Sequence, residues 1–195
     1  MIILQKSTIS SIRNTVRIQI FKPMSKKELV ISRQRIQDRV RELAEQISAD
    51  YTGKKFVMVG ILNGAFIFLA DLSRAVIIPH EIDFIRVASY GTRAASSGQI
   101  SLTKDVELEL AGKHILLVED IVDTGTTLAW LSKQFTGKQV ESVRICALID
   151  KKERRATEVN VDYLGFTLES GFLIGYGLDY AQQYRHLPEI YSLEI

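Results

Sequence analysis

The chain has 195 residues, an apolar fraction of 46%, a charged fraction of 25% and a formal net charge of +2. These values are ordinary for a globular chain of one domain, and they exclude a highly charged or low-complexity protein. The near-neutral charge gives no strong overall attraction to nucleic acid or to an anionic membrane, so neither is expected as a partner. No apolar run reaches the ~20 residues that a membrane-spanning helix requires.

The single cysteine, Cys146, lies in an apolar run and is expected to be a small core residue. One cysteine cannot form an intrachain disulfide, which is typical of a reducing compartment, so we expect a cytoplasmic protein. Residues 1–15 lack the hydrophobic region of a signal peptide and are expected to form a flexible N-terminal segment. Residues 16–195 are expected to form a single domain.

Strand and helix patterns alternate from Ser32 onward. Ser32 is a plausible N-cap, apolar residues then recur at helical spacing as far as Ile47, and Gly53 follows as a stop. Strands are expected at 56–62, around 82–87, and at 114–119, 143–149, 163–166 and 173–176, and further helices at 65–75 and 126–135. This alternation predicts an α/β fold with a parallel sheet flanked by helices, in which ligands bind at the carboxyl ends of the strands.

The segment from Tyr90 to Lys104 has a different composition. Gly, Ser, Thr, Ala and Arg dominate it, and apolar residues are sparse. This composition predicts a long polar loop, and long loops in compact domains are often lids over a functional site.

The most informative motif joins the third expected strand to the helix that follows it. Its Thr-Gly-Thr-Thr segment, 124–127, can surround a phosphate with backbone N–H groups and hydroxyls at a helix N-terminus. Glu119 and Asp120 come just before it, and adjacent carboxylates there suit a sugar diol, a hydrated Mg²⁺, or both. Asp123 lies between the two groups, where it could act on a base attached to the sugar. The alternative interpretation is an acidic turn that only caps the helix.

These residues resemble the phosphoribosyl pyrophosphate signature of type I phosphoribosyltransferases, and most nearly their hypoxanthine-guanine branch. The resemblance extends from about Val16 to the C-terminus. It implies the fold of that family, with a small hood built from the N- and C-terminal segments. It also implies purine salvage, in which the phosphoribosyl group of phosphoribosyl pyrophosphate is transferred to hypoxanthine or guanine with Mg²⁺ as cofactor, giving IMP or GMP and pyrophosphate. A homodimer or homotetramer is implied as well.

The resemblance assigns each predicted site residue to one part of the ligands. The catalytic residue is Asp123, which handles the proton on purine N7. The phosphoribosyl group would be bound by Glu119, Asp120, Thr124, Gly125, Thr126 and Thr127. The pyrophosphate would be bound by Asn63, Gly64, Ser89, Tyr90 and Arg185. The purine would be bound by Lys151, Phe172, Leu173 and Asp179, and the metal ligands would be Glu119, Asp120 and Asp179.

One position departs from the family pattern. Many members have a basic residue where this chain has Asn63. In the family this loop binds pyrophosphate through backbone amides, often over a non-proline cis peptide bond, so a backbone role survives the change and a role of a charged side chain does not. The preference among hypoxanthine, guanine and xanthine stays open.

A rival interpretation is a nucleotide-sensing regulator on the same fold, which binds RNA or a partner instead of catalysing. The combination of Asp123, Lys151, Asp179 and Arg185 favours an enzyme. The sequence also lacks a face rich in Lys and Arg with interleaved aromatic residues, which a nucleic-acid-binding regulator would need.

Overall fold

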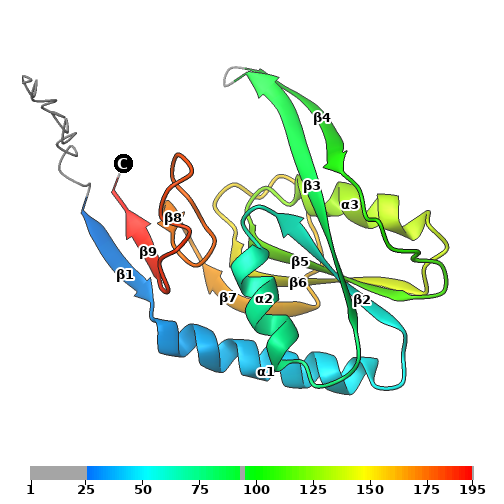
Figure 1. Cartoon of the computed structure of the whole chain (residues 1–195). Helices are drawn as coiled ribbons and strands as arrows, with labels where there is room; N and C mark the ends of the chain where they lie inside the picture. The colour runs from blue at the N-terminus through cyan, green and yellow to red at the C-terminus, as the bar shows by residue number, and fades with distance from the viewer. Residues whose placement is uncertain (1–25, 93–94, 195) are drawn as a thin grey trace, which may run out of the picture.

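A computed structural model describes residues 26–92 and 95–194, and the predicted flexible segment 1–15 lies outside them. The elements in chain order are β1 (Lys27–Ile31), α1 (Arg33–Tyr51), β2 (Phe56–Leu62), α2 (Phe66–Ala75), β3 (Glu81–Thr92), β4 (Ala95–Lys104), β5 (His114–Val122), α3 (Thr126–Thr136), β6 (Ser142–Lys151), β7 (Tyr163–Leu168), β8 (Leu173–Ile174) and β9 (Ile190–Leu193). Six strands form the central sheet in the order β4-β3-β2-β5-β6-β7, and three form a small second sheet in the order β1-β9-β8 (Figure 1).

The fold class predicted from the sequence is confirmed. Every neighbouring pair in the central sheet is parallel except β3 and β4. The small sheet pairs β1, near the start of the described residues, with β9, near their end, so segments from both ends of the described residues build the hood.

The prediction of a long polar loop at 90–104 is wrong. Most of this segment is strand: β3 continues to Thr92, and β4 returns antiparallel beside it, so the two form a hairpin that extends beyond the sheet (Figure 1). In a two-stranded ribbon outside the core, each strand satisfies the backbone hydrogen-bonding groups of the other, and the ribbon needs no apolar face. Its composition therefore lacked the hydrophobic signal on which a strand prediction depends.

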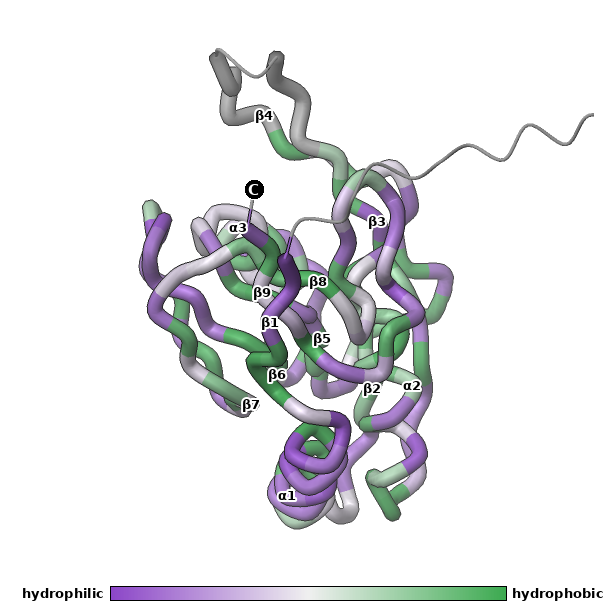
Figure 2. The backbone as a smooth tube through the Cα atoms, turned by 90° about the vertical axis from the view of Figure 1, so that its left-hand side faces the viewer, coloured by the Kyte–Doolittle hydropathy of each residue, from purple (hydrophilic) through white to green (hydrophobic). Residues whose placement is uncertain are grey.

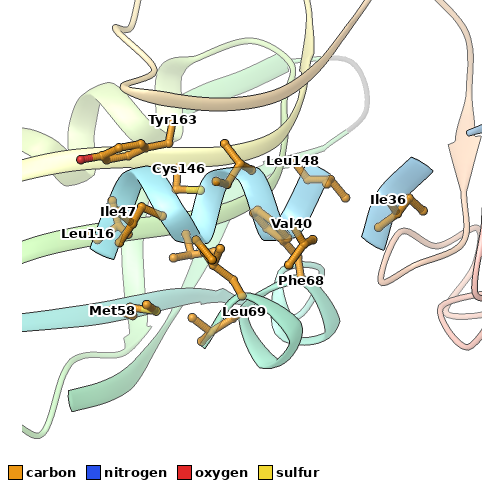
Figure 3. Packing of buried hydrophobic residues seen from close by; sticks show 14 of the residues in the cluster. Ile36, Val40, Ile47, Met58, Phe68, Leu69, Leu116, Cys146, Leu148 and Tyr163 are labelled. Atoms are coloured by element: carbon orange, nitrogen blue, oxygen red, sulfur yellow. The ribbon is translucent and has the colours of Figure 1, made fainter. Parts of the chain in front are cut away.

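Each face of the central sheet packs against helices, which explains the unbroken apolar runs of β2, β5 and β6. On one face, Met58 and Cys146 join a cluster with residues of α1 and α2, and Figure 3 shows Val40 of α1 close to Phe68 of α2 in that layer. On the other face, alternate strand residues pack against α3. In Figure 2 the hydrophobic colour runs along these strands, whereas hydrophilic residues dominate α1.

The first helix begins and ends where the sequence predicts. Ser32 is its N-cap and accepts a hydrogen bond from the Arg35 N–H at 3.4 Å. Gly53, just past the end, adopts φ of 75°, a conformation that glycine tolerates best. In the described ranges, no helix is both long enough and apolar enough to span a bilayer.

A buried carboxylate, Asp83, holds the base of the β3–β4 hairpin. Its oxygens accept hydrogen bonds from the N–H groups of Phe84 (2.6 Å), Glu107 (2.6 Å) and Leu108 (3.0 Å), and Lys104 Nζ lies 3.4 Å away. Burial alone would raise the pKa of Asp83, but these donors and the Lys104 charge outweigh it and hold the pKa below its ordinary value. The segment that follows β4 is thereby fixed to β3.

We predict that Asp83→Asn lowers the free energy of unfolding at pH 7 by roughly 1–3 kcal/mol, because the amide turns a donor toward backbone N–H groups. A carboxyl group whose pKa is lowered on folding stabilises the protein above its unfolded pKa, about 3.9, and loses that effect as pH falls through the folded pKa. The difference between the free energies of unfolding of wild type and variant, measured with denaturant, should therefore become smaller below about pH 4. Asp38→Asn, in an exposed helix ion pair with Arg41, is the control and should cost under about 1 kcal/mol. A difference that does not depend on pH would contradict this account of Asp83.

Candidate active site

The strand order places the predicted site at a switch point of the sheet. From β2 the chain continues to β3 on one side, and β5 lies on the other side of β2. Open α/β sheets bind ligands in the crevice beyond the carboxyl ends of such strands. Here a cavity of about 290 Å³ lies at that point. Its walls include the predicted residues Asn63, Gly64, Glu119, Asp120, Thr127, Asp179 and Arg185.

The turn after β2 has the cis peptide bond expected from the family, between Leu62 and Asn63. Gly64, the next residue, has no room for a side chain. A Cβ atom there would overlap the Asp120 carboxylate, and a Cβ on Gly177 would in turn overlap the Gly64 carbonyl oxygen. The backbone of this turn is therefore in direct contact with both β5 and the loop that follows β8.

Glu119 and Asp120 lie within β5, which runs on to Val122 and so ends later than predicted. Burial raises the pKa of both carboxyl groups, and the Asp120 charge raises that of Glu119 further. Asp179, the third predicted metal ligand, forms an ion pair with Arg185 at 2.6 Å. Within residues 26–92 and 95–194 there is no group of three or more His, Cys, Asp or Glu side chains close enough to hold a metal ion alone.

The predicted phosphate-binding segment follows β5 directly. A cavity of about 110 Å³ is lined by Glu119, Ile121, Val122, Asp123, Thr124, Gly125, Thr127 and Leu128. Gly125 is the N-cap of α3 and has φ of 79°, and a Cβ there would overlap the carbonyl oxygen of Thr157. Gly125 has no side chain to cap the helix, and the Thr126 N–H donates to the Thr124 hydroxyl at 3.4 Å. The remaining N–H groups of the first turn can face an anion.

Asp123 lies between two cationic side chains. One of its oxygens is 2.7 Å from Arg154 Nη2, and the other is 3.7 Å from Lys151 Nζ. The oxygen that faces Lys151, Oδ1, is buried and has no hydrogen-bond partner among the described residues. Lys151, at the end of β6, is itself buried and donates to the Gly171 carbonyl oxygen at 3.3 Å.

The hood supplies Phe172 and Leu173, two of the predicted purine-binding residues. Phe172 follows Gly171, is 38% exposed and packs edge-on against Tyr180 with ring centroids 5.5 Å apart. The Phe172 carbonyl oxygen accepts from the Leu193 N–H at 2.8 Å, so it is used within the hood. Leu173 begins β8 and is buried. The partly exposed ring of Phe172 therefore belongs to the residue next to Gly171, whose carbonyl oxygen accepts from Lys151.

Three residues of this region were not predicted from the sequence: Arg154, Arg155 and Tyr180. The two arginines follow the strand that ends in Lys151. Adjacent arginines just past a strand end are only a weak sequence signal for a functional site, and these two are recognised through their contacts with Asp123. Tyr180 is recognisable only through its contact with Phe172. The side chains of Ser89 and Tyr90 lie outside the described part of the structure.

Comparison with known proteins gives one consistent result. The family model "Phosphoribosyl transferase domain" matches residues 30–181. Hypoxanthine phosphoribosyltransferase of Salmonella typhimurium is 41% identical over 165 residues, which are 84% of this chain and 93% of that protein. Hypoxanthine-guanine phosphoribosyltransferase of Mycobacterium tuberculosis is 39% identical over 174 residues, 86% of each chain. A crystal structure of the Staphylococcus aureus hypoxanthine phosphoribosyltransferase matches with a TM-score of 0.82 and 37% identity, over 86% of this chain and 91% of that one.

The contact at Gly64 predicts a specific cost. Gly64→Ala should lower the free energy of unfolding by about 1–3 kcal/mol, the usual range for overpacking, because Asp120 must move. Gly137→Ala is the matched control, since its φ is −75° and the nearest atom to an added Cβ is 3.6 Å away. That variant should be neutral, or more stable by up to about 1 kcal/mol. Equal unfolding curves for Gly64→Ala and wild type would show that the turn is not packed in this way.

Proposed function

The chain belongs to the hypoxanthine-guanine phosphoribosyltransferase family, and from this premise we propose that it makes IMP or GMP from a 6-oxopurine and phosphoribosyl pyrophosphate. In this reaction the bond from ribose C1 to the pyrophosphate oxygen breaks, and a bond from C1 to purine N9 forms. Pyrophosphate leaves, and the purine loses one proton. The residues at the strand ends of the central sheet have the chemistry that each part of this reaction requires.

The observation that carries the proposal is the pairing of Lys151 with Asp123 at 3.7 Å. A 6-oxopurine presents its O6 acceptor and its N7 group side by side on one edge. A lysine donor next to a carboxylate acceptor matches that edge, with Lys151 on O6 and Asp123 on the N7 proton. A 6-aminopurine presents a donor at position 6, so its amino group would face the Lys151 ammonium donor instead of accepting from it.

The phosphate groups would occupy two separate places. The 5′-phosphate would lie in the cavity at residues 124–127, where backbone N–H groups and hydroxyls meet a helix N-terminus. The pyrophosphate would lie at Asn63 and Gly64, facing Arg185. Arg185 donates to the Gly177 carbonyl oxygen at 2.6 Å and pairs with Asp179, so its guanidinium is held in one place to meet the leaving charge.

Mg²⁺ fits the donor set at the end of β5. Two adjacent carboxylates with raised pKa values, Glu119 and Asp120, form a site where a cation would stabilise the charged forms. Mg²⁺ usually takes one or two carboxylates and completes its coordination with water and substrate phosphates, so a third protein carboxylate is not required. When bound, it would neutralise charge on the pyrophosphate.

The β3–β4 hairpin is proposed to close over the site. Positive charge develops on the ribose as pyrophosphate leaves, and water would compete with the purine for C1. The hairpin begins from the strand that neighbours β2, and Val87 on it lines the cavity at Gly64. Closure of this hairpin would exclude water while the base attacks.

The direct test is an absorbance assay of the purified full chain with hypoxanthine, phosphoribosyl pyrophosphate and Mg²⁺, followed by identification of the product. Formation of IMP with release of one equivalent of pyrophosphate is the expected result. Absence of turnover with hypoxanthine, guanine and xanthine would overturn the proposed function.

Asp123→Asn is expected to lower kcat by about 10²-fold or more, the usual scale for loss of a group that exchanges a proton in the transition state. The KM values of both substrates should change less, since the amide keeps the shape of the side chain. Steady-state kinetics would measure both. The exposed Asp38→Asn serves as the control, and a near-normal kcat for Asp123→Asn would remove this residue from the proposed chemistry.

Lys151 is expected to determine which purines are used. The wild type should use hypoxanthine and reject adenine by several orders of magnitude, as sites that hydrogen-bond a substrate group reject analogues without it by about 10⁴-fold. Lys151→Ala should raise the KM for hypoxanthine far more than the KM for phosphoribosyl pyrophosphate. Competition between the two purines in one assay measures the preference, and efficient use of adenine by the wild type would refute the assigned role.

A further inference from the structure

The segment after β6 holds the outer side of the phosphate-binding loop. Arg155 Nε donates to the carbonyl oxygen of Asp123 at 3.1 Å, and Arg155 Nη2 donates to that of Val122 at 3.3 Å. The next two backbone N–H groups, of Ala156 and Thr157, both donate to the Thr124 carbonyl oxygen, at 3.0 and 2.9 Å. Three consecutive carbonyls of the loop, 122–124, are therefore fixed by three consecutive residues, 155–157.

Fixing these carbonyls also fixes the N–H groups of the same peptide units. The cis peptide bond of the described chain is that between Leu62 and Asn63, so these units are trans. In a trans unit the C=O and the N–H point to opposite sides. With the carbonyls of residues 122–124 turned toward Arg155 and its neighbours, the N–H groups of Asp123, Thr124 and Gly125 point the other way.

Two of these N–H groups, those of Thr124 and Gly125, have no acceptor among the described residues and can bind an anion. The residues that carry them also line the cavity of about 110 Å³. Successive N–H groups that converge in this way form an anion-binding concavity whose strength depends on their direction.

We propose that Arg155 is a positioning residue that aims these amide groups at the 5′-phosphate, an inference that rests on the proposed function. Arg155 is suited to the role because its side chain is only 10% exposed and forms an ion pair with Asp150, whose side chain is also 10% exposed. The planar guanidinium offers several donors in a fixed arrangement, so it binds two carbonyls and a carboxylate at once. A lysine in its place would keep the charge and lose this arrangement.

The test compares IMP with inosine, which differ only in the 5′-phosphate. Dissociation constants of both are measured by equilibrium competition for wild type, Arg155→Lys and the double variant Arg155→Met/Asp150→Asn. The double variant removes the buried carboxylate that Arg155→Met alone would leave unpaired. For both variants IMP affinity should fall by about 10-fold or more, since charge-assisted hydrogen bonds are lost from the loop, while inosine affinity changes by less than about 3-fold.

Arg39→Met is the matched control. Arg39 also binds backbone carbonyls, those of Leu164 (2.6 Å) and Gly165 (3.0 Å), and it pairs with Glu42. It belongs to α1, which packs on the face of the central sheet opposite to α3. Its IMP and inosine affinities should both stay within about 3-fold of wild type, a free-energy change below ~0.7 kcal/mol. Circular dichroism and thermal melting confirm that each protein is folded.

Two results would overturn the inference. If the Arg155 variants lose affinity for IMP and inosine by the same factor, the residue supports the fold and not the phosphate site. If Arg155→Lys binds IMP as tightly as wild type, a positive charge at this position is enough for binding, and the two carbonyl contacts of the guanidinium do not contribute to it. Failure of the wild type to bind IMP would instead refute the proposed function itself.

Discussion

The absence of a side chain at Gly64 is the constraint on which the site depends. Asp120 of β5 packs against the backbone at this point, and Gly177 of the hood packs on the other side of it. Three parts of the chain therefore meet without intervening side chains: the turn after β2, the end of β5 and the hood loop. Because the hood contact is between backbone atoms and the β5 contact is between backbone and carboxylate, these contacts leave little freedom in how the hood is placed on the sheet. The position of Arg185, which donates to the Gly177 carbonyl oxygen, follows from the same contact.

The charges of the site come from different elements and are unevenly matched. Most of the carboxylates come from β5 and the loop after it. The cations come from elsewhere: Lys151 ends β6, Arg154 follows that strand, and Arg185 belongs to the hood. Asp123 and Asp179 each have a cation within ion-pair distance. Among the described residues, no cation lies within ion-pair distance of Glu119 or Asp120, and burial raises the pKa of both carboxyl groups. The site therefore has a deficit of positive charge at one defined place, and a cation that arrives with the substrate would supply it.

The sequence was most informative where a residue type is tied to a single chemistry. The strands buried on both faces could be predicted, because burial restricts composition. The Thr-Gly-Thr-Thr segment and the carboxylates of β5 could be identified as candidate ligand-binding residues, because phosphate and metal binding favour these residue types. The β3–β4 hairpin could not be predicted, because a paired ribbon outside the core accepts almost any polar residue. Arg155 could not either, because its role depends on which carbonyls it contacts, and no spacing in the sequence encodes that. The proposed purine-binding face rests on family resemblance alone, since Phe172 by itself is indistinguishable in the sequence from a core residue.

The small sheet has a consequence for the order in which the molecule can be assembled. Its middle strand, β9, lies between β1 and β8, so the sheet needs residues from Lys27 and from Leu193 at the same time. Contacts between such distant parts of a chain form late, because a long loop must close before they stabilise anything. The phosphate loop needs only β5, α3 and the segment at 155–157, all of which are synthesised earlier. During translation, the half of the site that we propose holds the sugar phosphate can thus be complete before the wall that we propose faces the base exists.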